Sequence, residues 1–345
     1  MRFERRLHAS PLLTLGAPVL ALAFALLVAG GLIALSGAPV IEAYRRIFIG
    51  AFGSRLAITE TLTRATPLIL TGLAAAVAFR AKVWNIGAEG QFYMGALAVA
   101  AFGGVVPGIV AVPALMLIGA LAGVILLVVP VALRLRFGVD EVVTTLLLNF
   151  IVLLFVSLAI EGFLRDPLAF GWPQSVPVPP EARLDKLVDR TRLHTGLIVA
   201  VVVAVVVWAI HRFTVFGLQS RAAGTNAAAA RFAGVPIGAT LLKVACLSGG
   251  LAGLAGAIEV MGVKGHVSTA LSPGFGYTGI VVAMLANLSA IGVVFAALFV
   301  AAMFVGADGM SRALEVPSFI ADVTTSLALL AMLVALFFTQ YRVAR

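Results

Sequence analysis

Three polar side chains at the start of an apolar run are candidates for binding a solute inside a membrane. Asn85, Glu89 and Gln91 lie in the motif WNIGAEGQ, among glycines. A charged side chain at the centre of a bilayer helix costs about 2.5–3.5 kcal/mol on insertion scales, so such residues face cavities or protein partners. The motif therefore predicts contact with a polar solute. The alternative interpretation is an interfacial helix start, with Glu89 favourable in the first turn.

A second group of polar residues opens another apolar run, in the motif GVDEVVTTLLLN. Asp140 and Glu141 stand where the dipole of a helix favours acids. Two threonines and Asn149 follow at near-helical spacing. One polar stripe on an apolar helix predicts a face turned into a helix bundle, where it either lines a path or forms hydrogen bonds between helices.

The third candidate is a short helix within the polar stretch 221–236. Asn226 is a predicted N-cap, alanines follow it, and Gly234 with Pro236 forms a stop signal. Phe232 is the one large apolar side chain among the alanines. This pattern predicts a capped helix that contacts another protein, whereas a helix resting on lipid headgroups is the alternative.

The motifs of several enzyme classes are absent from the sequence. A nucleotide-binding P-loop needs Gly-Lys followed by Ser or Thr, but the four lysines precede Val, Leu, Val and Gly. The four histidines show no metal-ligand spacing, and no GxSxG nucleophile motif occurs. We therefore expect no enzyme activity, no metal site and no cofactor on this chain.

The composition indicates that these motifs lie within a membrane protein. The chain has 345 residues, of which 62% are hydrophobic and 11% charged, with a mean hydropathy of +1.12. Soluble domains are about 25% charged, and so few charges cannot cover a water-exposed surface. The net charge of +9 is better explained by membrane orientation than by nucleic acid. The single Cys246 predicts a small buried hydrophobic side chain.

Apolar runs of about 20 residues predict an all-α polytopic protein with about ten spans in a single transmembrane domain, 1–345. The first run follows a basic N-terminus and is too long for a signal peptide, so we expect it to be retained. The expected spans are Pro11–Leu35, Leu56–Phe79, Ile86–Val105, Ile109–Leu133, Val142–Phe163, Thr195–Ile210, Leu242–Val263, Gly276–Leu288, Ile291–Ala307 and Phe319–Phe338.

The distribution of charge predicts that both termini are cytoplasmic. With this orientation the short inner loops carry almost only lysine and arginine, as the positive-inside rule requires. The proline-rich loop 164–195 then falls outside and the polar loop 212–243 falls inside.

Two glycine-rich stretches suggest an internal repeat. Gly72–Gly90 and Gly250–Gly279 each contain a small-residue span, a connection, and a GxxG that opens the next span. The copies lie five spans apart, and this odd offset predicts two inverted five-helix halves with interrupted helices, which is typical of transporters. Glycine-mediated packing at both places explains the same pattern.

Four motifs together resemble the permease subunits of ABC importers for nucleosides and simple sugars, in the superfamily of the branched-chain amino acid and ribose permeases. They are TPLILTGLAAAVAFRAKVWNIGAEGQFYMGA, DEVVTTLLLNF, RAAGTNAAAARFAGVP and GFGYTGIVVAMLA, in the family's order along nearly the whole chain. One departure is Ala227, where the family often has proline. The resemblance implies a bacterial plasma-membrane permease that forms the pathway for a small polar solute, with a nucleoside favoured.

The resemblance also implies partners and site residues. The partners are ABC ATPase subunits that use ATP and magnesium, a second permease and an extracytoplasmic substrate-binding protein, with no nucleic acid. The expected solute path consists of Asn85, Glu89, Gln91, Phe92, Tyr93 and Asn149. The expected ATPase-coupling residues are Arg221, Gly224, Asn226, Arg231, Phe232 and Gly234. The alternative function is an ion-coupled secondary transporter of a sugar or nucleoside, which would use a buried Glu89.

Overall fold

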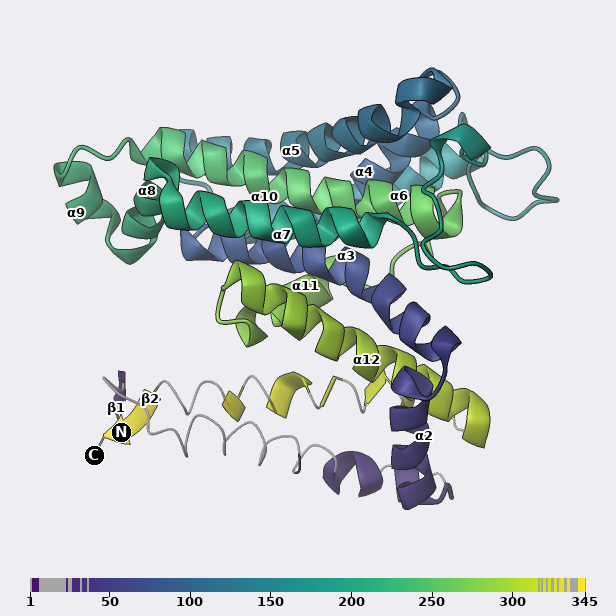
Figure 1. Ribbon diagram of the computed structural model, residues 1–345. Coiled ribbons are helices and arrows are strands. Elements are labelled where there is room, and N and C mark those ends of the chain that lie inside the picture. The colour runs from purple at the N-terminus through teal and green to yellow at the C-terminus, as the bar shows by residue number, and fades with distance from the viewer. Residues whose placement is uncertain are drawn as a thin grey trace. The chain divides into compact units, whose positions relative to one another are not determined.

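The computed structural model describes residues 37–315 without a gap, and beyond them residues 2–5, 23, 27–31, 33–35, 317, 319–320, 322–323, 326–327, 329–331, 334–335 and 341–344. These residues form helices and one pair of short strands (Figure 1). The α-helices are α2 (Val40–Phe52), α3 (Arg55–Arg80), α4 (Ala88–Phe102), α5 (Ala111–Phe137), α6 (Glu141–Glu161), α7 (Gly196–Phe213), α8 (Val215–Thr225), α9 (Ala227–Phe232), α10 (Ile237–Glu259), α11 (Phe275–Leu285) and α12 (Ala290–Leu314). The minor elements are the 3₁₀ turns Gly108–Val110 and Pro180–Ala182, the π-turn Val260–Lys264 and the strands β1 (Arg2–Arg5) and β2 (Tyr341–Ala344).

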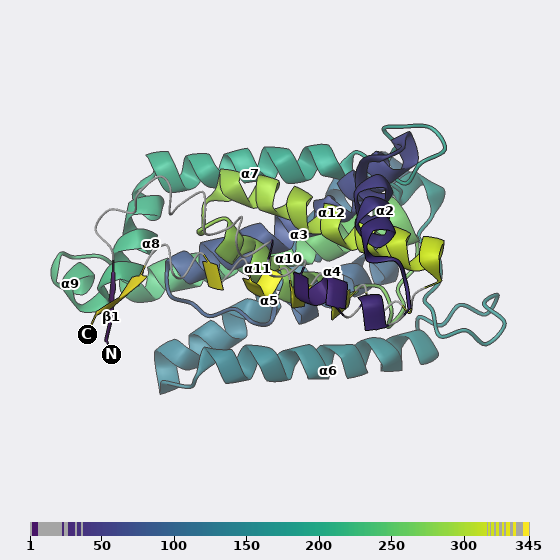
Figure 2. The same cartoon turned by 90° about the horizontal axis from the view of Figure 1, so that it is seen from below.

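The chain divides into two compact units, Met1–Thr61 with Leu298–Arg345, and Leu62–Ala297. The second unit is built around α10, which packs against α4 and α5. Helix α6 contacts α4 and α5, and Figure 2 shows α6 and α7 along opposite edges of this unit. The unit contains every residue expected from the sequence to act in transport or coupling.

Glycine allows α10 to approach its neighbours at backbone distance. A Cβ atom on Gly253 would collide with the carbonyl oxygen of Gly119 in α5, and one on Gly256 would collide with the carbonyl oxygen of Phe92 in α4. Small residues are favoured between membrane helices because lipid supplies no hydrophobic driving force, so close packing must hold the helices together. The glycine-rich sequence thus specifies the centre of the unit.

The expectation of about ten spans is not confirmed. Six described helices are long and apolar enough to cross a membrane, namely α3, α5, α6, α7, α10 with its π-turn, and α12, and a bent pair before α3 raises the number to seven. Helix α11 has 11 residues, about 16 Å, and α4 has 15, about 22 Å, whereas the hydrocarbon core is about 30 Å thick. The run Ile86–Val105 therefore contains a shorter helix than its hydropathy predicted, whereas the run Gly276–Leu288 was predicted to be short and nearly coincides with α11. The predicted spans Pro11–Leu35 and Phe319–Phe338 lie largely outside the described residues.

Both glycine-rich stretches have the same local structure. A long helix ends, a non-helical connection follows, and a new helix begins close to a glycine. The first connection is residues 81–87, between α3 and α4, and the second is residues 265–274, between the π-turn and α11. The starts of α4 and α11 lie together, because a Cβ atom on Gly276 would collide with the backbone of Glu89. The sequence repeat thus corresponds to two interrupted helices that meet.

The first unit contains a helix that hydropathy did not predict. Helix α2 carries Glu42, whose carboxylate accepts hydrogen bonds from Arg45 at 3.2 Å and Arg46 at 2.7 Å. These charges lower the hydropathy, but Ala43 on the other face is buried with Met310 of α12. The pattern is that of an amphipathic helix. In the same unit, β1 and β2 pair antiparallel, so the two ends of the chain lie side by side, while their cytoplasmic location stays a prediction.

We expect Gly253→Ala to lower the thermal midpoint of the purified chain. The added methyl group must displace the backbone of α5, and overpacking costs up to about 3 kcal/mol, which outweighs the gain of about 1 kcal/mol in helix propensity. Gly238→Ala, in the first turn of the same helix, is the control because a Cβ atom there meets nothing within 4 Å. Equal thermal midpoints for the two variants would refute close packing at Gly253.

Candidate solute pathway and coupling surface

The connection before α4 is held by a buried amide pair. Asn85 Nδ2 donates to Gln91 Oε1 at 2.9 Å, and Gln91 Nε2 donates back to Asn85 Oδ1 at 2.9 Å. Asn85 Nδ2 also donates to Ser248 Oγ of α10 at 3.1 Å, and Ser248 donates to the carbonyl of Ala74 in α3 at 2.7 Å. These bonds connect α3, α4 and α10 at one point.

Asn149 connects α6 to both interrupted helices. Its Oδ1 accepts the Gly90 N–H at 2.8 Å, and its Nδ2 donates to the Ile86 carbonyl at 2.9 Å and to the Tyr277 hydroxyl of α11 at 3.1 Å. Asn149 is fully buried, so water does not compete for these bonds. The predicted polar stripe of α6 therefore faces the bundle.

Glu89 lies where α4 and α11 begin. Its Oε2 accepts the Gly276 N–H at 2.6 Å, and the side chain is only 4% exposed. Glu89 stands in the first turn of α4 and Gly276 in the first turn of α11. Both helix N-termini carry partial positive charge, which stabilises the carboxylate.

The two aromatic candidates are also buried beside the start of α11. The Phe92 ring lies 5.9 Å from the Phe275 ring, centroid to centroid. The Tyr93 hydroxyl donates to the Thr269 carbonyl at 2.7 Å and accepts the Ser272 N–H at 3.2 Å. The structure thus brings Asn85, Glu89, Gln91, Phe92, Tyr93 and Asn149 together around the first turns of α4, but it does not test contact with a solute.

Three polar residues of this cluster were missed from the sequence. Ser248 stands within a glycine-rich apolar run, and Ser272 caps the start of α11 by accepting the N–H groups of Gly274 at 3.0 Å and Phe275 at 2.8 Å. Tyr277 is 39% exposed and belongs to the motif GFGYTG. The only feature of the sequence that could have indicated these three residues is a single hydroxyl group within an apolar run.

The N-terminal end of α6 is anchored by the two acids that the sequence singled out there. Asp140 is the N-cap and its side chain accepts the Val142 N–H at 2.8 Å. Glu141 forms an ion pair with Arg134 at the end of α5 and accepts the Trp84 N–H at 3.4 Å. The connection 81–87 is therefore fixed from both α5 and α6.

The loop 164–195, which the charge distribution predicts to be external, is bound to the segment that follows α10. The Ser175 N–H donates to the Val267 carbonyl at 2.9 Å, and the Leu184 N–H donates to the Met261 carbonyl at 3.0 Å. Lys186 Nζ donates to the Gly262 carbonyl at 2.6 Å. Burial, followed by the charge of Lys186, lowers the pKa of His194 to about 4, so this side chain is neutral at pH 7. The loop is therefore held against the rest of the unit by several hydrogen bonds.

The capped helix predicted in the inner loop is present as α9. Asn226 Oδ1 accepts the Ala229 N–H at 3.0 Å, and Gly234 ends the helix with a φ of 84°. Phe232 is 97% exposed, and Arg231 beside it is exposed as well. The preceding helix α8 was not predicted. Helix α8 carries Arg221 and Gly224. A Cβ atom on Gly224 would collide with the carbonyl oxygen of Arg80, so α8 packs at backbone distance from the end of α3.

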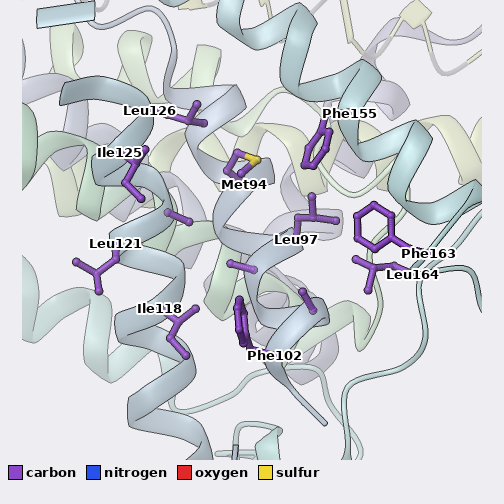
Figure 3. A pocket seen from close by; sticks show the side chains of 13 residues that line it. Met94, Leu97, Phe102, Ile118, Leu121, Ile125, Leu126, Phe155, Phe163 and Leu164 are labelled. Atoms are coloured by element: carbon purple, nitrogen blue, oxygen red, sulfur yellow. The ribbon is translucent and has the colours of Figure 1, made fainter. Parts of the chain in front are cut away.

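A cavity of about 440 Å³ lies between α4, α5, α6 and the start of the loop 164–195 (Figure 3). Its labelled lining residues are hydrocarbon, aromatic or thioether side chains, including Met94, Leu121 and Phe155. Such a surface offers no hydrogen bonds to solute hydroxyl groups. This cavity is therefore not suited to binding a polar solute. Within the described residues, no group of three or more His, Cys, Asp or Glu side chains is placed to bind a metal ion.

Comparison with known proteins identifies relatives along the chain. Residues 57–339 match the family model described as branched-chain amino acid transport system / permease component. The chain is 35% identical to a glucose ABC transporter permease of Haloferax volcanii, over 96% of this chain and 90% of that protein. It is 35% identical to a guanosine ABC transporter permease of Bacillus subtilis, over 88% of this chain and 89% of that protein. It is 32% identical to a nucleoside ABC transporter permease of Lactococcus lactis, over 90% of this chain and 88% of that protein.

We expect Asn149→Ala to destabilise the protein strongly, because it leaves the buried Gly90 N–H and Ile86 carbonyl without partners. Each unpaired group costs about 1–3 kcal/mol. Thr144→Ala on the same helix is the control, since its hydroxyl bonds only to the Asp140 carbonyl in the preceding turn. The measurement is the thermal midpoint in detergent. A midpoint for Asn149→Ala as high as that of the control would show that these bonds do not stabilise the helix start.

Proposed function

Because the chain belongs to the permease component family of branched-chain amino acid transport systems, we propose that it forms the translocation pathway of an ABC importer for a nucleoside. The chain is an ABC transporter permease and a multi-pass plasma-membrane protein, and the observation that carries this is the family match over residues 57–339. The match favours ATP-driven transport over the ion-coupled alternative.

The proposed solute class rests on relatives and on chemistry. Two of the three relatives described above are named for nucleosides or guanosine and one for glucose. Both classes of solute present several hydroxyl groups, but a nucleoside also has a flat base that stacks on aromatic rings. Tyr277 offers an exposed ring and a hydroxyl beside the polar cluster.

We place the pathway wall along the connection 265–274 and α11. Irregular backbone at membrane depth is tolerated where it is buried in protein or lines a cavity, and interrupted helices are where transporters bind solutes. Thr269 and Pro273 of this connection are exposed in the isolated chain. The six residues expected from the sequence then support the wall, since the amides of Asn85, Gln91 and Asn149 already bond within the chain.

The partners follow from membership of the family. An ABC permease works with ATPase subunits, which supply ATP and magnesium chemistry, and with a substrate-binding protein. We propose a second permease, identical or homologous, across the pathway. The proposed ATPase contact is α9 with Arg221, Gly224, Asn226, Arg231, Phe232 and Gly234, because the helix is capped, exposed and carries a single aromatic side chain.

The reconstituted complex should import radiolabelled guanosine only when ATP is enclosed with the ATPase subunits. Excess unlabelled nucleoside should compete, whereas excess glucose should not. Uptake driven equally well by an ion gradient without ATP would contradict the importer assignment. ATP-dependent import of radiolabelled glucose, without import of guanosine, would retain the importer and replace the nucleoside with a sugar.

We expect Phe232→Ala to weaken ATPase binding by about 1–3 kcal/mol, because buried aromatic anchors dominate protein interfaces. Co-purification of the ATPase and ATP-driven uptake are the readouts. Phe137→Ala is the matched control, since Phe137 is an exposed aromatic residue at the end of α5, outside the loop 212–243. Full ATPase recovery and normal uptake with Phe232→Ala would rule out this residue as the anchor.

A further inference from the structure

A second polar pocket, distinct from the cluster at α4, lies at the inner ends of the helices. It has a volume of about 180 Å³ and is lined by residues of α3, α7, α8 and the start of α12. Three of its lining residues are Arg80, Arg212 and Arg221, and none is acidic. Within the described part of the chain, none of the three arginines forms an ion pair.

The guanidinium groups keep donors for a ligand. Arg80 Nη2 donates to the Leu288 carbonyl at 3.1 Å, and Arg221 Nη2 donates to the His211 carbonyl at 3.3 Å. A guanidinium has five N–H donors, so each of these bonds uses only one of them. Positive charges held together without an anion repel one another, and a ligand with negative charge relieves that repulsion.

A buried ring nitrogen shows independently that this pocket is incomplete. His211 is 5% exposed and lines the pocket, and its Nδ1 contacts the Val207 carbonyl at 3.1 Å. Its Nε2 is buried and has no hydrogen-bond partner. Buried polar atoms in native proteins nearly always have a partner. Ser289 and Ala290 add the N-terminus of α12, a helix end that favours anions.

We propose that this pocket binds the phosphate group of an anionic phospholipid of the inner leaflet. Three guanidinium groups match phosphate oxygens, and basic pockets between helices on the cytoplasmic side bind lipid headgroups. A water molecule occupies about 30 Å³ of liquid, so a pocket of about 180 Å³ has room for a phosphate group.

The surroundings favour a lipid over free phosphate. Trp208 lines the pocket and is 41% exposed, and tryptophan is enriched at the membrane interface. The same helix exposes Val201, Val202 and Val205 toward its other end. A lipid whose phosphate lies among the arginines can therefore place its acyl chains along this apolar face of α7.

The test uses the purified full-length chain without its partners, with Trp208 as its only tryptophan in a Trp84→Phe, Trp172→Phe background. Its fluorescence is titrated with short-chain phosphatidylglycerol, short-chain phosphatidylcholine and inorganic phosphate. We expect saturable binding of phosphatidylglycerol, and weaker binding of the other two at equal concentration. Arg212→Gln should weaken phosphatidylglycerol binding about five-fold, the value of one basic residue near an anionic surface. This variant retains the fold, because Arg212 forms no hydrogen bond or ion pair within the described residues.

Arg136→Gln is the matched control. Arg136 is an exposed arginine at the end of α5, at an inner helix end but outside this pocket, so its loss should leave phosphatidylglycerol binding unchanged. If both variants weakened phosphatidylglycerol binding equally, the effect would come from the overall positive charge, and the proposed site would be overturned. Equal binding of inorganic phosphate would overturn the lipid as ligand, and equal binding of phosphatidylcholine would overturn anion recognition. Loss of binding when the ATPase is added would show that protein covers the pocket instead.

Discussion

An interrupted helix inside a membrane leaves backbone N–H and carbonyl groups with no water to bond, and the rest of this structure depends on how those groups are satisfied. Each unpaired group in hydrocarbon costs several kcal/mol. Here the interruption before α4 is satisfied by side chains from other helices, above all Asn149, which bonds to one N–H and one carbonyl of that segment. Ser272 does the same for α11 within its own connection. Asn85, Asn149 and Ser272 thus place their polar atoms at the two points where the backbone stops being helical.

Glycine residues are the second requirement for satisfying these backbone groups, because they set the distances between helices. A polar side chain can bond across helices only if the helices lie close, and Gly253 and Gly256 bring α10 to backbone distance from α5 and α4. That approach also delivers Ser248 to the amide of Asn85. The glycines therefore position the hydrogen bonds, and the hydrogen bonds fix the register of the glycines. This mutual dependence accounts for a core that has few charges and yet places a carboxylate between two helix starts.

Sequence reasoning succeeded where one residue type has one dominant physical role. Long apolar runs predicted α3, α5, α6, α7, α10 and α12, and the capping residue Asn226 with its glycine stop predicted α9. It failed where hydropathy is ambiguous. An apolar run does not reveal whether its helix starts at the membrane surface or halfway through, so the run Ile86–Val105 was assigned a full span although α4 is shorter. The charges of α2 concealed a helix whose other face is buried. Ser248 and Tyr277 were missed because their partners lie far away in sequence, at Asn85 and Asn149.

If an ATPase binds α9 as proposed, the contacts among α7 to α10 determine how its motion would reach the polar cluster. Helices α8 and α9 both pack against α10, and only Asn226 separates them. Under the proposed ATPase contact, a force on α9 would therefore be passed to α10, whose Ser248, in the middle of the helix, contacts the interruption before α4. Helix α8 also carries one of the pocket arginines, on the side that contacts α7. A phosphate bound there would contact both α7 and α8 and so hold them in place at the bilayer surface. A displacement of α9 would then move α10, because the rest of the loop could not move with α9. Lipid binding and ATPase coupling would then act on neighbouring helices of one segment, with α10 as their shared connection to the pathway.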